Sequence, residues 1–275
     1  MLTLDHLVIN TRFDTDAAER LFTELGFTVA PRGYHTLGSI NHAIVFGEHY
    51  LELIGLPASG EVVREEILAS PLGLDGLVWR TDDPAVTAAS LLAAGFEAGA
   101  PQVFSRPVEL DGASFDARFA TVRLAAGQLP GGRVYFCQHL TPELVFRAQW
   151  QSHPNQAYGL AALHLIVDDV AANKAAYDRL GEIDPAPLPS SSRGASLGSS
   201  FSLKHWTRAG FDAHFGAPAM HLAARQPRYG ALTVRSPQWH AIGTRTQAMG
   251  LPTQIREQST VIALPRFDTL LELSP

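Results

Sequence analysis

Apolar residues recur along the chain with two different spacings, and the two spacings alternate. The stretch "LDHLVIN" (residues 4–10) is typical of a strand, because β-branched and other apolar residues dominate it. Residues 12–27 carry apolar positions at helical spacing, and Gly26 favours a helix end. Short β-type runs separated by Pro and Gly follow as far as Leu56. The pattern predicts the order β-α-β-β-β for residues 2–56.

This order of elements recurs along the chain. "LDGLVWRTDD" (residues 74–83) repeats the first strand and precedes a helix with Pro84 in its first turn and Gly95 at its end. "LAALHLIVDD" (residues 160–169) opens a third unit, and "YGALTVRS" (residues 229–236) opens a fourth. Internal repetition decides the architecture before any motif is interpreted. The repeats predict four related units.

Polar residues with Pro and Gly occupy residues 147–159, between the second and third units. Segments of this composition are typical of domain boundaries. The sequence therefore predicts an N-terminal domain over residues 1–150 and a C-terminal domain over residues 158–275, each built from two units.

Composition excludes several classes of protein. The 275 residues are 46% hydrophobic, enough for a sizeable core, and carry 21 basic and 27 acidic residues. No basic run favours nucleic acid or an anionic membrane, and no segment is typical of a signal peptide or a membrane span. The single cysteine, Cys137, excludes an intramolecular disulfide and is expected to be a buried small side chain. We expect a cytoplasmic protein.

Four stretches carry a resemblance to a known family: "LDHLVIN", "INHAIVFGEHYLELIG", "VYFCQHLTPELVF" and "SHPN". They resemble the vicinal oxygen chelate superfamily, and within it the glyoxalase-like branch. The resemblance implies an α+β fold in which βαβββ modules pair into two curved mixed-sheet cups. It also implies a divalent metal inside a cup, with ligands from the first and last strands of each module. Members include lyases, extradiol dioxygenases, epimerases, thiol transferases and antibiotic-binding proteins, so the fold is better indicated than the reaction.

Strand alternation independently favours this interpretation. His6 shares a strand face with Leu4 and Val8, whereas Leu7 and Ile9 point the other way. The apolar face packs against helices, so the face with His6 lines the cup.

The same rule places further His and Glu side chains toward a cup. Glu52 in "YLELIG" is opposed by leucines, as are His164 and Glu272 in the C-terminal half. Each half therefore offers one imidazole and one carboxylate, a pair that suits zinc, iron, nickel or manganese. We expect His6 and Glu52 to bind metal, with a buried charge pair as the alternative, and His164 and Glu272 to form a second candidate cup.

The chain departs from the complete four-ligand pattern. Gly76 occupies the position of His6 in the second unit, and Ala231 or Leu232 does so in the fourth. In "CQHL" either Gln138 or His139 can face inward, but not both. His139 would complete a set of His6, Glu52 and His139.

Two residues of "GYHTLGSINH" are further candidates. The resemblance places His35 and Asn41 at the rim of the cup, whereas ordinary turn chemistry is the alternative. His35 or a displaced Glu52 is the candidate base, and Asn41 and Gln138 are candidate substrate-binding residues.

Two functions agree with these observations. The first is a metal-dependent lyase, isomerase or dioxygenase that acts on a small molecule with vicinal oxygens, centred on the N-terminal cup. The second is a protein of the same fold that binds a small molecule without turnover, which Gly76 favours. A small molecule is the expected partner, and formation of a homodimer is left open.

Overall fold

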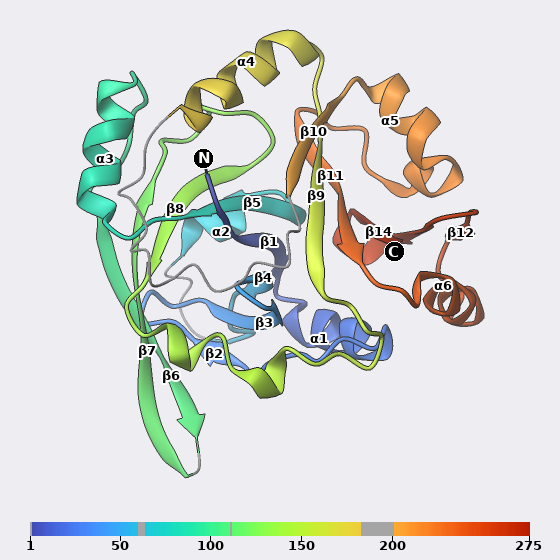
Figure 1. Ribbon diagram of the computed structural model, residues 1–275, viewed down its shortest axis with the longest axis horizontal. Helices are drawn as coiled ribbons and strands as arrows, with labels where there is room; N and C mark the ends of the chain where they lie inside the picture. The colour runs from blue at the N-terminus through green and yellow to red at the C-terminus, as the bar shows by residue number, and fades with distance from the viewer. Residues whose placement is uncertain (1, 60–63, 111, 183–200) are drawn as a thin grey trace.

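The computed structural model describes residues 2–59, 64–110, 112–182 and 201–275 (Figure 1). Two curved mixed sheets make up most of the fold, one of eight strands and one of six. This architecture confirms the expected α+β fold of repeated modules. No helix in the described part of the chain is both long and apolar enough to cross a membrane.

The eight-stranded sheet comes from the N-terminal half and has the strand order β2-β3-β4-β1-β5-β8-β7-β6. Parallel pairs β1–β4 and β5–β8 flank the antiparallel contact of β1 with β5, so two modules meet at its centre. Its elements are β1 (Leu4–Arg12), α1 (Thr15–Glu24), β2 (Gly33–Tyr34), β3 (Ile40–Phe46), β4 (His49–Gly55), α2 (Glu65–Ala69), β5 (Gly73–Arg80), α3 (Pro84–Ala93), β6 (Gln102–Leu110), β7 (Ala113–Arg123), β8 (Arg133–His139), η1 (Pro142–Leu144) and η2 (Ala148–Trp150).

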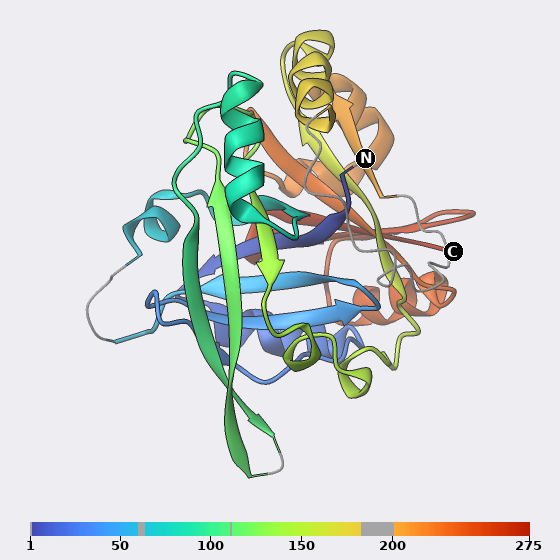
Figure 2. The same ribbon diagram turned by 60° about the vertical axis from the view of Figure 1, so that its left-hand side comes forward.

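This sheet curves until its two edges approach each other. The Thr36 amide after β2 donates to the Ser105 carbonyl on β6, at 2.9 Å, although β2 and β6 are the outermost strands. Strands β6 and β7 extend well beyond the rest of the sheet (Figure 2). The N-terminal cup is therefore almost a closed barrel.

The six-stranded sheet comes from the C-terminal half and has the order β10-β9-β11-β14-β13-β12. Parallel pairs β9–β10 and β11–β14 again flank an antiparallel centre, the contact of β9 with β11. Between β9 and β11 the described residues contribute β10 alone to the sheet, and two helices follow it. The elements are β9 (Gly159–Ile166), α4 (Val170–Gly181), β10 (Ser202–Trp206), α5 (Arg208–Phe215), η4 (Ala217–His221), β11 (Arg228–Arg235), α6 (Trp239–Ala248), β12 (Thr253–Ile255), β13 (Thr260–Leu264), η5 (Pro265–Phe267) and β14 (Thr269–Ser274).

Local sequence signals determine where helix α3 begins and ends. The Asp83 carboxylate accepts hydrogen bonds from the backbone amides of Ala85 and Val86, and Pro84 occupies the first turn. Gly95 follows the helix with φ +80°, a conformation that glycine adopts without strain. The predicted bounds of this helix are confirmed.

Strand β1 alternates as expected from His6 onward, but not before it. Val8 packs in the apolar cluster of the cup, whereas Leu7 and Ile9 belong to the core behind the sheet. Leu4 also lies in the core behind the sheet, so its predicted position beside His6 is wrong. The pairing with β5 shifts register between Leu4 and His6, and such a bulge reverses the alternation.

The two sheets share one apolar core. A single cluster contains Leu7 and Leu51 from the first sheet together with Leu163 and Leu165 from the second. The chain passes from one sheet to the other between η2 and β9, within the segment expected to be a boundary. Packing therefore continues across this segment, although the sheets change there.

Candidate functional site

The concave face of the eight-stranded sheet encloses a cavity with a polar floor. His6 and Glu52 lie on it side by side, because β1 and β4 are adjacent parallel strands. Polar and aromatic side chains from β3, β6, β7 and β8 surround them. The lining residues are His6, His35, Asn41, Ala43, Tyr50, Glu52, Ile54, Arg64, Phe104, Arg106, Phe119, Thr121, Arg123, Tyr135, Cys137 and Val145.

The orientation of the His6 ring is set by the residue before it. Asp5 Oδ1 lies 2.5 Å from His6 Nδ1, and a carboxylate can only accept, so Nδ1 carries the proton. The other ring nitrogen, Nε2, then faces the cup, and it carries the lone pair when the ring is neutral. It lies 3.7 Å from Glu52 Oε2 and 3.3 Å from the Tyr135 hydroxyl. The Tyr50 ring stacks on the imidazole, with centroids 4.3 Å apart.

Glu52 is held in its ionised form. Burial alone would raise the pKa of this carboxyl, but His6, His35 and a hydrogen bond from Asn41 outweigh burial and lower it. The Asn41 amide donates to Oε1 at 2.7 Å, which leaves Oε2 directed toward His6. The structure thus brings together three predicted site residues: His6, Glu52 and Asn41.

The third predicted ligand, His139, lies on the other side of Asp5. Its Nε2 donates to Asp5 Oδ1 at 3.0 Å. Within the described residues, the donor atoms of His6, Glu52 and His139 do not gather around one point. Gln138 points away from the cup and donates its amide to the carbonyl of Asp82. It is not among the lining residues of the cavity.

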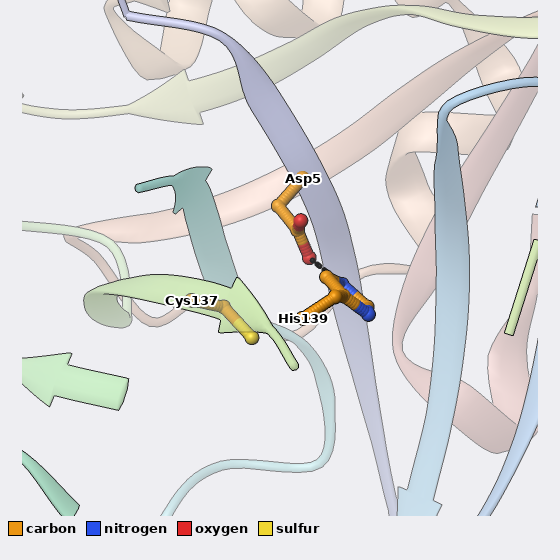
Figure 3. Close-up of side chains that lie close together, drawn as sticks. All are labelled: Asp5, Cys137 and His139. Atoms are coloured by element: carbon orange, nitrogen blue, oxygen red, sulfur yellow. Dashed lines mark hydrogen bonds and ion pairs between the residues drawn. The ribbon is translucent and has the colours of Figure 1, made fainter. Parts of the chain in front are cut away.

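One group of three side chains in the described part of the chain is close enough to share an ion: Asp5, Cys137 and His139 (Figure 3). Asp5 Oδ1 in this group is already engaged by two imidazoles. Burial, followed by the charges of Asp5 and Glu52, raises the pKa of the Cys137 thiol well above its ordinary value. The thiol is therefore neutral, and it behaves as the buried small side chain that was expected.

His35 lines the cavity from the turn before β3. Burial lowers its pKa to about 4, with Glu52 opposing the shift, so the imidazole is neutral at pH 7. Its Nδ1 lies 2.9 Å from the Ser39 hydroxyl. His35 can accept a proton inside the cup.

Strand register identifies which side chains replace the two missing ligands. Val8 lies opposite Glu52 in the pair β1–β4, and Val78 lies opposite Tyr135 in the pair β5–β8. Tyr135 therefore corresponds to Glu52 in the second module, and Gly76 corresponds to His6. A Cβ atom on Gly76 would lie only 2.7 Å from Val8 Cγ2, so packing excludes a larger residue there. Burial raises the pKa of Tyr135 well above its ordinary value, so its hydroxyl stays protonated.

The His6 and Glu52 pair fits a divalent ion. Glu52 is ionised, His6 Nε2 carries a lone pair, and each side chain is fixed by a neighbour on its other atom. A carboxylate that orients a histidine through its second nitrogen is the usual arrangement behind a metal ligand. Tyr135 offers a hydroxyl beside them. This set of donor atoms contains fewer strong ligands than a closed structural site. It would leave coordination positions of the ion open.

Comparison with known proteins identifies the family. The family of glyoxalase-like domains matches residues 4–181, which is more than half of the chain. The chain belongs to this family. No curated protein matches the chain.

Solved structures share the glyoxalase-like fold at low sequence identity. A hypothetical protein from Staphylococcus aureus superposes with a TM-score of 0.62 at 10% identity, covering 100% of both chains. A mutant of 4-hydroxymandelate synthase from Streptomyces coelicolor gives 0.53 at 17% identity, covering 99% of this chain and 92% of that one. A xylose isomerase-like TIM barrel/4-hydroxyphenylpyruvate dioxygenase fusion protein gives 0.52 at 11% identity, covering 98% and 48%. These likenesses show the fold alone.

The second candidate cup of this glyoxalase-like chain is arranged differently. The Trp206 indole donates to His164 Nδ1 at 3.0 Å, so Nε2 carries the proton and lies 2.9 Å from the Thr233 hydroxyl. Thr233 in turn donates to Glu272 Oε2 at 2.8 Å. Burial lowers the pKa of His164 to about 3, so the ring is neutral. Both ring nitrogens are engaged, and no lone pair is directed at an ion.

Helix α5 fills the space that would be the C-terminal cup. Phe211 and Phe215 are fully buried and pack on the concave face with Ile166, Ala231 and Leu270. His214 of the same helix lies 4.0 Å from Glu272 Oε1. The described residues thus form a packed core where the N-terminal half forms a cavity.

Sequence reasoning overlooked Asp5, Tyr135 and Arg106. Simple alternation would have placed Asp5 among the leucines behind the sheet, where a lone carboxylate is costly, and that conflict was a usable signal. No strand was predicted over Arg106, and its burial is apparent only in the structure. The equivalence of Tyr135 to Glu52 depends on strand register, which the pattern of residues does not reveal.

Proposed function

We propose that the N-terminal cup binds a divalent metal through His6 and Glu52 and acts on a small molecule with vicinal oxygens, as a lyase, isomerase or dioxygenase. The observation that carries this proposal is the convergence of His6 Nε2 and Glu52 Oε2, 3.7 Å apart. Asp5 and Asn41 hold the opposite ends of the two side chains. Membership of the glyoxalase-like family supports the metal and leaves the reaction open.

The side chains around this pair have distinct roles in the proposal. When bound, the ion supplies Lewis acidity to two adjacent substrate oxygens. Asp5 keeps the His6 tautomer with its lone pair in the cup. The protonated Tyr135 hydroxyl, 3.3 Å from His6 Nε2, donates a hydrogen bond to an oxygen that gains negative charge. His35, neutral and buried, accepts the proton that leaves carbon, with a displaced Glu52 as the alternative base.

Binding without turnover is the second candidate function. It is favoured by Gly76 and Tyr135, which stand where the second module would supply its own two ligands. A site with two strong ligands holds an ion more weakly than a complete set does.

Metal content decides between these functions. Wild-type protein should contain close to one equivalent of a divalent metal, and chelator should lower its melting temperature. At a hundredfold excess over the dissociation constant the ion adds about 2.7 kcal/mol to the free energy of unfolding. His6→Ala should lose both the metal and the response to chelator.

Cys137→Ser is the matched control, because Cys137 lies in the same cavity but belongs to the other candidate group. It should keep its metal. If Cys137→Ser lost its metal and His6→Ala retained it, the metal would bind at Asp5, Cys137 and His139 instead. A wild-type protein that binds no divalent ion would leave only the binding function.

A further inference from the structure

Arg106 on β6 is a buried cation without a partner among the described residues. Its side chain lines the cavity and the residue is only 5% exposed. No carboxylate in the described chain pairs with it, and its Nε has no hydrogen-bond acceptor. Burial lowers its pKa, with Tyr50 and Glu52 opposing the shift, but a guanidinium remains charged at neutral pH. Such a group is costly unless something neutralises it.

The side chain lies beside the proposed metal ligands. A Cβ atom added to Gly33 would come within 2.6 Å of Arg106 Cδ and 2.4 Å of Asn41 Oδ1, so the missing side chain makes room for both. Asn41 in turn holds Glu52. Arg106 therefore extends toward the pair of His6 and Glu52.

The other two arginines of the cavity are already paired. Arg64 Nε donates to Glu66 Oε1 at 2.6 Å, and Arg123 Nη1 lies 3.7 Å from the same oxygen. The Arg64 guanidinium also donates to the Ser39 hydroxyl at 3.0 Å. Glu66 therefore contacts the guanidinium groups of Arg64 and Arg123, and no ion pair in the described residues joins it to Arg106.

The carboxylates near the cavity are all engaged by other groups. Asp5 accepts from two imidazoles, and Glu66 pairs with Arg64 and Arg123. Glu52 accepts from the Asn41 amide and lies beside His6. Within the described residues no ion pair joins any of these carboxylates to Arg106, so a negative charge supplied from outside would neutralise it.

We propose that Arg106 binds the carboxylate of the substrate, and that the substrate is a small organic acid with an aromatic or apolar body. The proposal deepens the function proposed above and rests on its choice of the N-terminal cup as the binding site. A single free guanidinium suits a planar monoanion, which it can bind through two parallel hydrogen bonds. A phosphate dianion would call for more than one free cation.

Aromatic side chains next to Arg106 suit the body of such an acid. The rings of Phe104 and Phe119 stack with centroids 5.2 Å apart, and His35 meets both rings edge-on. Both phenylalanines line the same cavity. An acid held by Arg106 would therefore lie between an aromatic wall and the metal ligands.

Three probes of similar shape test the charge requirement: benzoate, its neutral amide benzamide, and phenyl phosphate. Calorimetry on the wild-type protein, once with added divalent metal and once with chelator, should show benzoate binding at least about tenfold tighter than benzamide, or about 1.4 kcal/mol. Equal affinities, or no benzoate binding tighter than about 10 mM in either condition, would overturn the proposal. Tighter binding of phenyl phosphate would overturn the choice of a carboxylate.

Arg106→Gln should lose at least about tenfold in benzoate affinity while its benzamide affinity is unchanged. Arg118→Gln, which alters an exposed arginine of β7, should change neither. Without ligand, Arg106→Gln should melt at the same temperature as wild type or higher, because a buried cation without a partner is removed. A lower melting temperature would show that Arg106 is structural.

These readouts are separate from the metal assay. A protein without metal that still distinguishes benzoate from benzamide through Arg106 would retain this inference and lose the enzymatic proposal. A metal-loaded protein that binds benzoate and benzamide equally would retain the enzymatic proposal and lose this inference.

Discussion

Asp5 connects the two histidines at the floor of the N-terminal cup. Its Oδ1 accepts from His6 Nδ1 and from His139 Nε2, and the residue is fully buried. Burial would raise the pKa of this carboxyl, but the charges and hydrogen bonds of His139 and His6 outweigh burial, and the pKa falls well below its ordinary value. The carboxylate thus stays ionised and sets the orientation of both rings.

Asp5→Asn should lower the free energy of unfolding by about 3 kcal/mol at pH 7, because a buried charge network loses its centre. A lowered pKa in the folded state means that the stabilisation is complete above the unfolded value of about 3.9 and is lost as the pH falls below it. The difference in the free energy of unfolding between wild type and Asp5→Asn should therefore become smaller in acid. Urea unfolding at pH 7 and pH 3 measures it, with the exposed Asp116→Asn as control. A difference that is the same at both pH values would contradict this account.

At the scale of elements, the last strands of the first and the fourth modules serve different purposes. Strand β4 places Glu52 on the floor of a cavity, whereas β14 places Glu272 in a chain of hydrogen bonds behind helix α5. The parallel pairs β1–β4 and β9–β10 place the two histidines on matching strands. Similar strand geometry therefore leaves a cavity only where no helix packs on the concave face.

Glu52→Gln should remove bound metal, whereas Glu272→Gln should leave metal content unchanged. The first substitution takes a charged ligand from the cup, and the second changes the acceptor of the Thr233 hydroxyl and a contact with His214, both outside the cup. Elemental analysis of the two variants, prepared in parallel, measures the difference. Loss from Glu272→Gln alone would place the ion in the C-terminal half, and equal losses from both variants would contradict the choice of the N-terminal cup.

At the scale of the whole molecule, Asn155 joins the two halves. Its side chain donates to the Leu25 carbonyl at 3.1 Å, and its own backbone amide donates to Gly26 at 3.0 Å. The Ser236 hydroxyl, from the C-terminal half, donates to the Asn155 carbonyl at 2.6 Å. The segment that the composition marked as a boundary is thus hydrogen-bonded to both halves of the chain.

Asn155→Ala should destabilise the protein by about 2 kcal/mol, since buried hydrogen-bond partners lose their side-chain bonds. The shared core predicts that both halves unfold in one transition, in the variant as in the wild type. Far-ultraviolet circular dichroism and tryptophan fluorescence, followed in the same denaturant series, should give one midpoint. Two separated transitions would show that the halves are independent domains.

Local patterning was sufficient to predict the repeated units, the end of α3 at Gly95 and the direction of His6 and Glu52. Alternation along a strand and capping at a helix end involve residues close in sequence, so the chain itself specifies them. The single bulge before His6 is enough to misplace Leu4, because one shifted residue reverses every earlier position.

Only the tertiary structure decided which residues the side chains of the two cups contact. Asp5 reaches His139 across 134 positions of sequence, and Tyr135 stands in the second ligand position because of the register of β5 and β8. Among the described residues Arg106 has no ion-pair partner, whereas Arg64 and Arg123 both contact Glu66. The C-terminal cup is filled because α5 folds onto its concave face. Register, closure of a sheet and competition for partners depend on contacts between distant segments, and periodicity along the chain does not encode them.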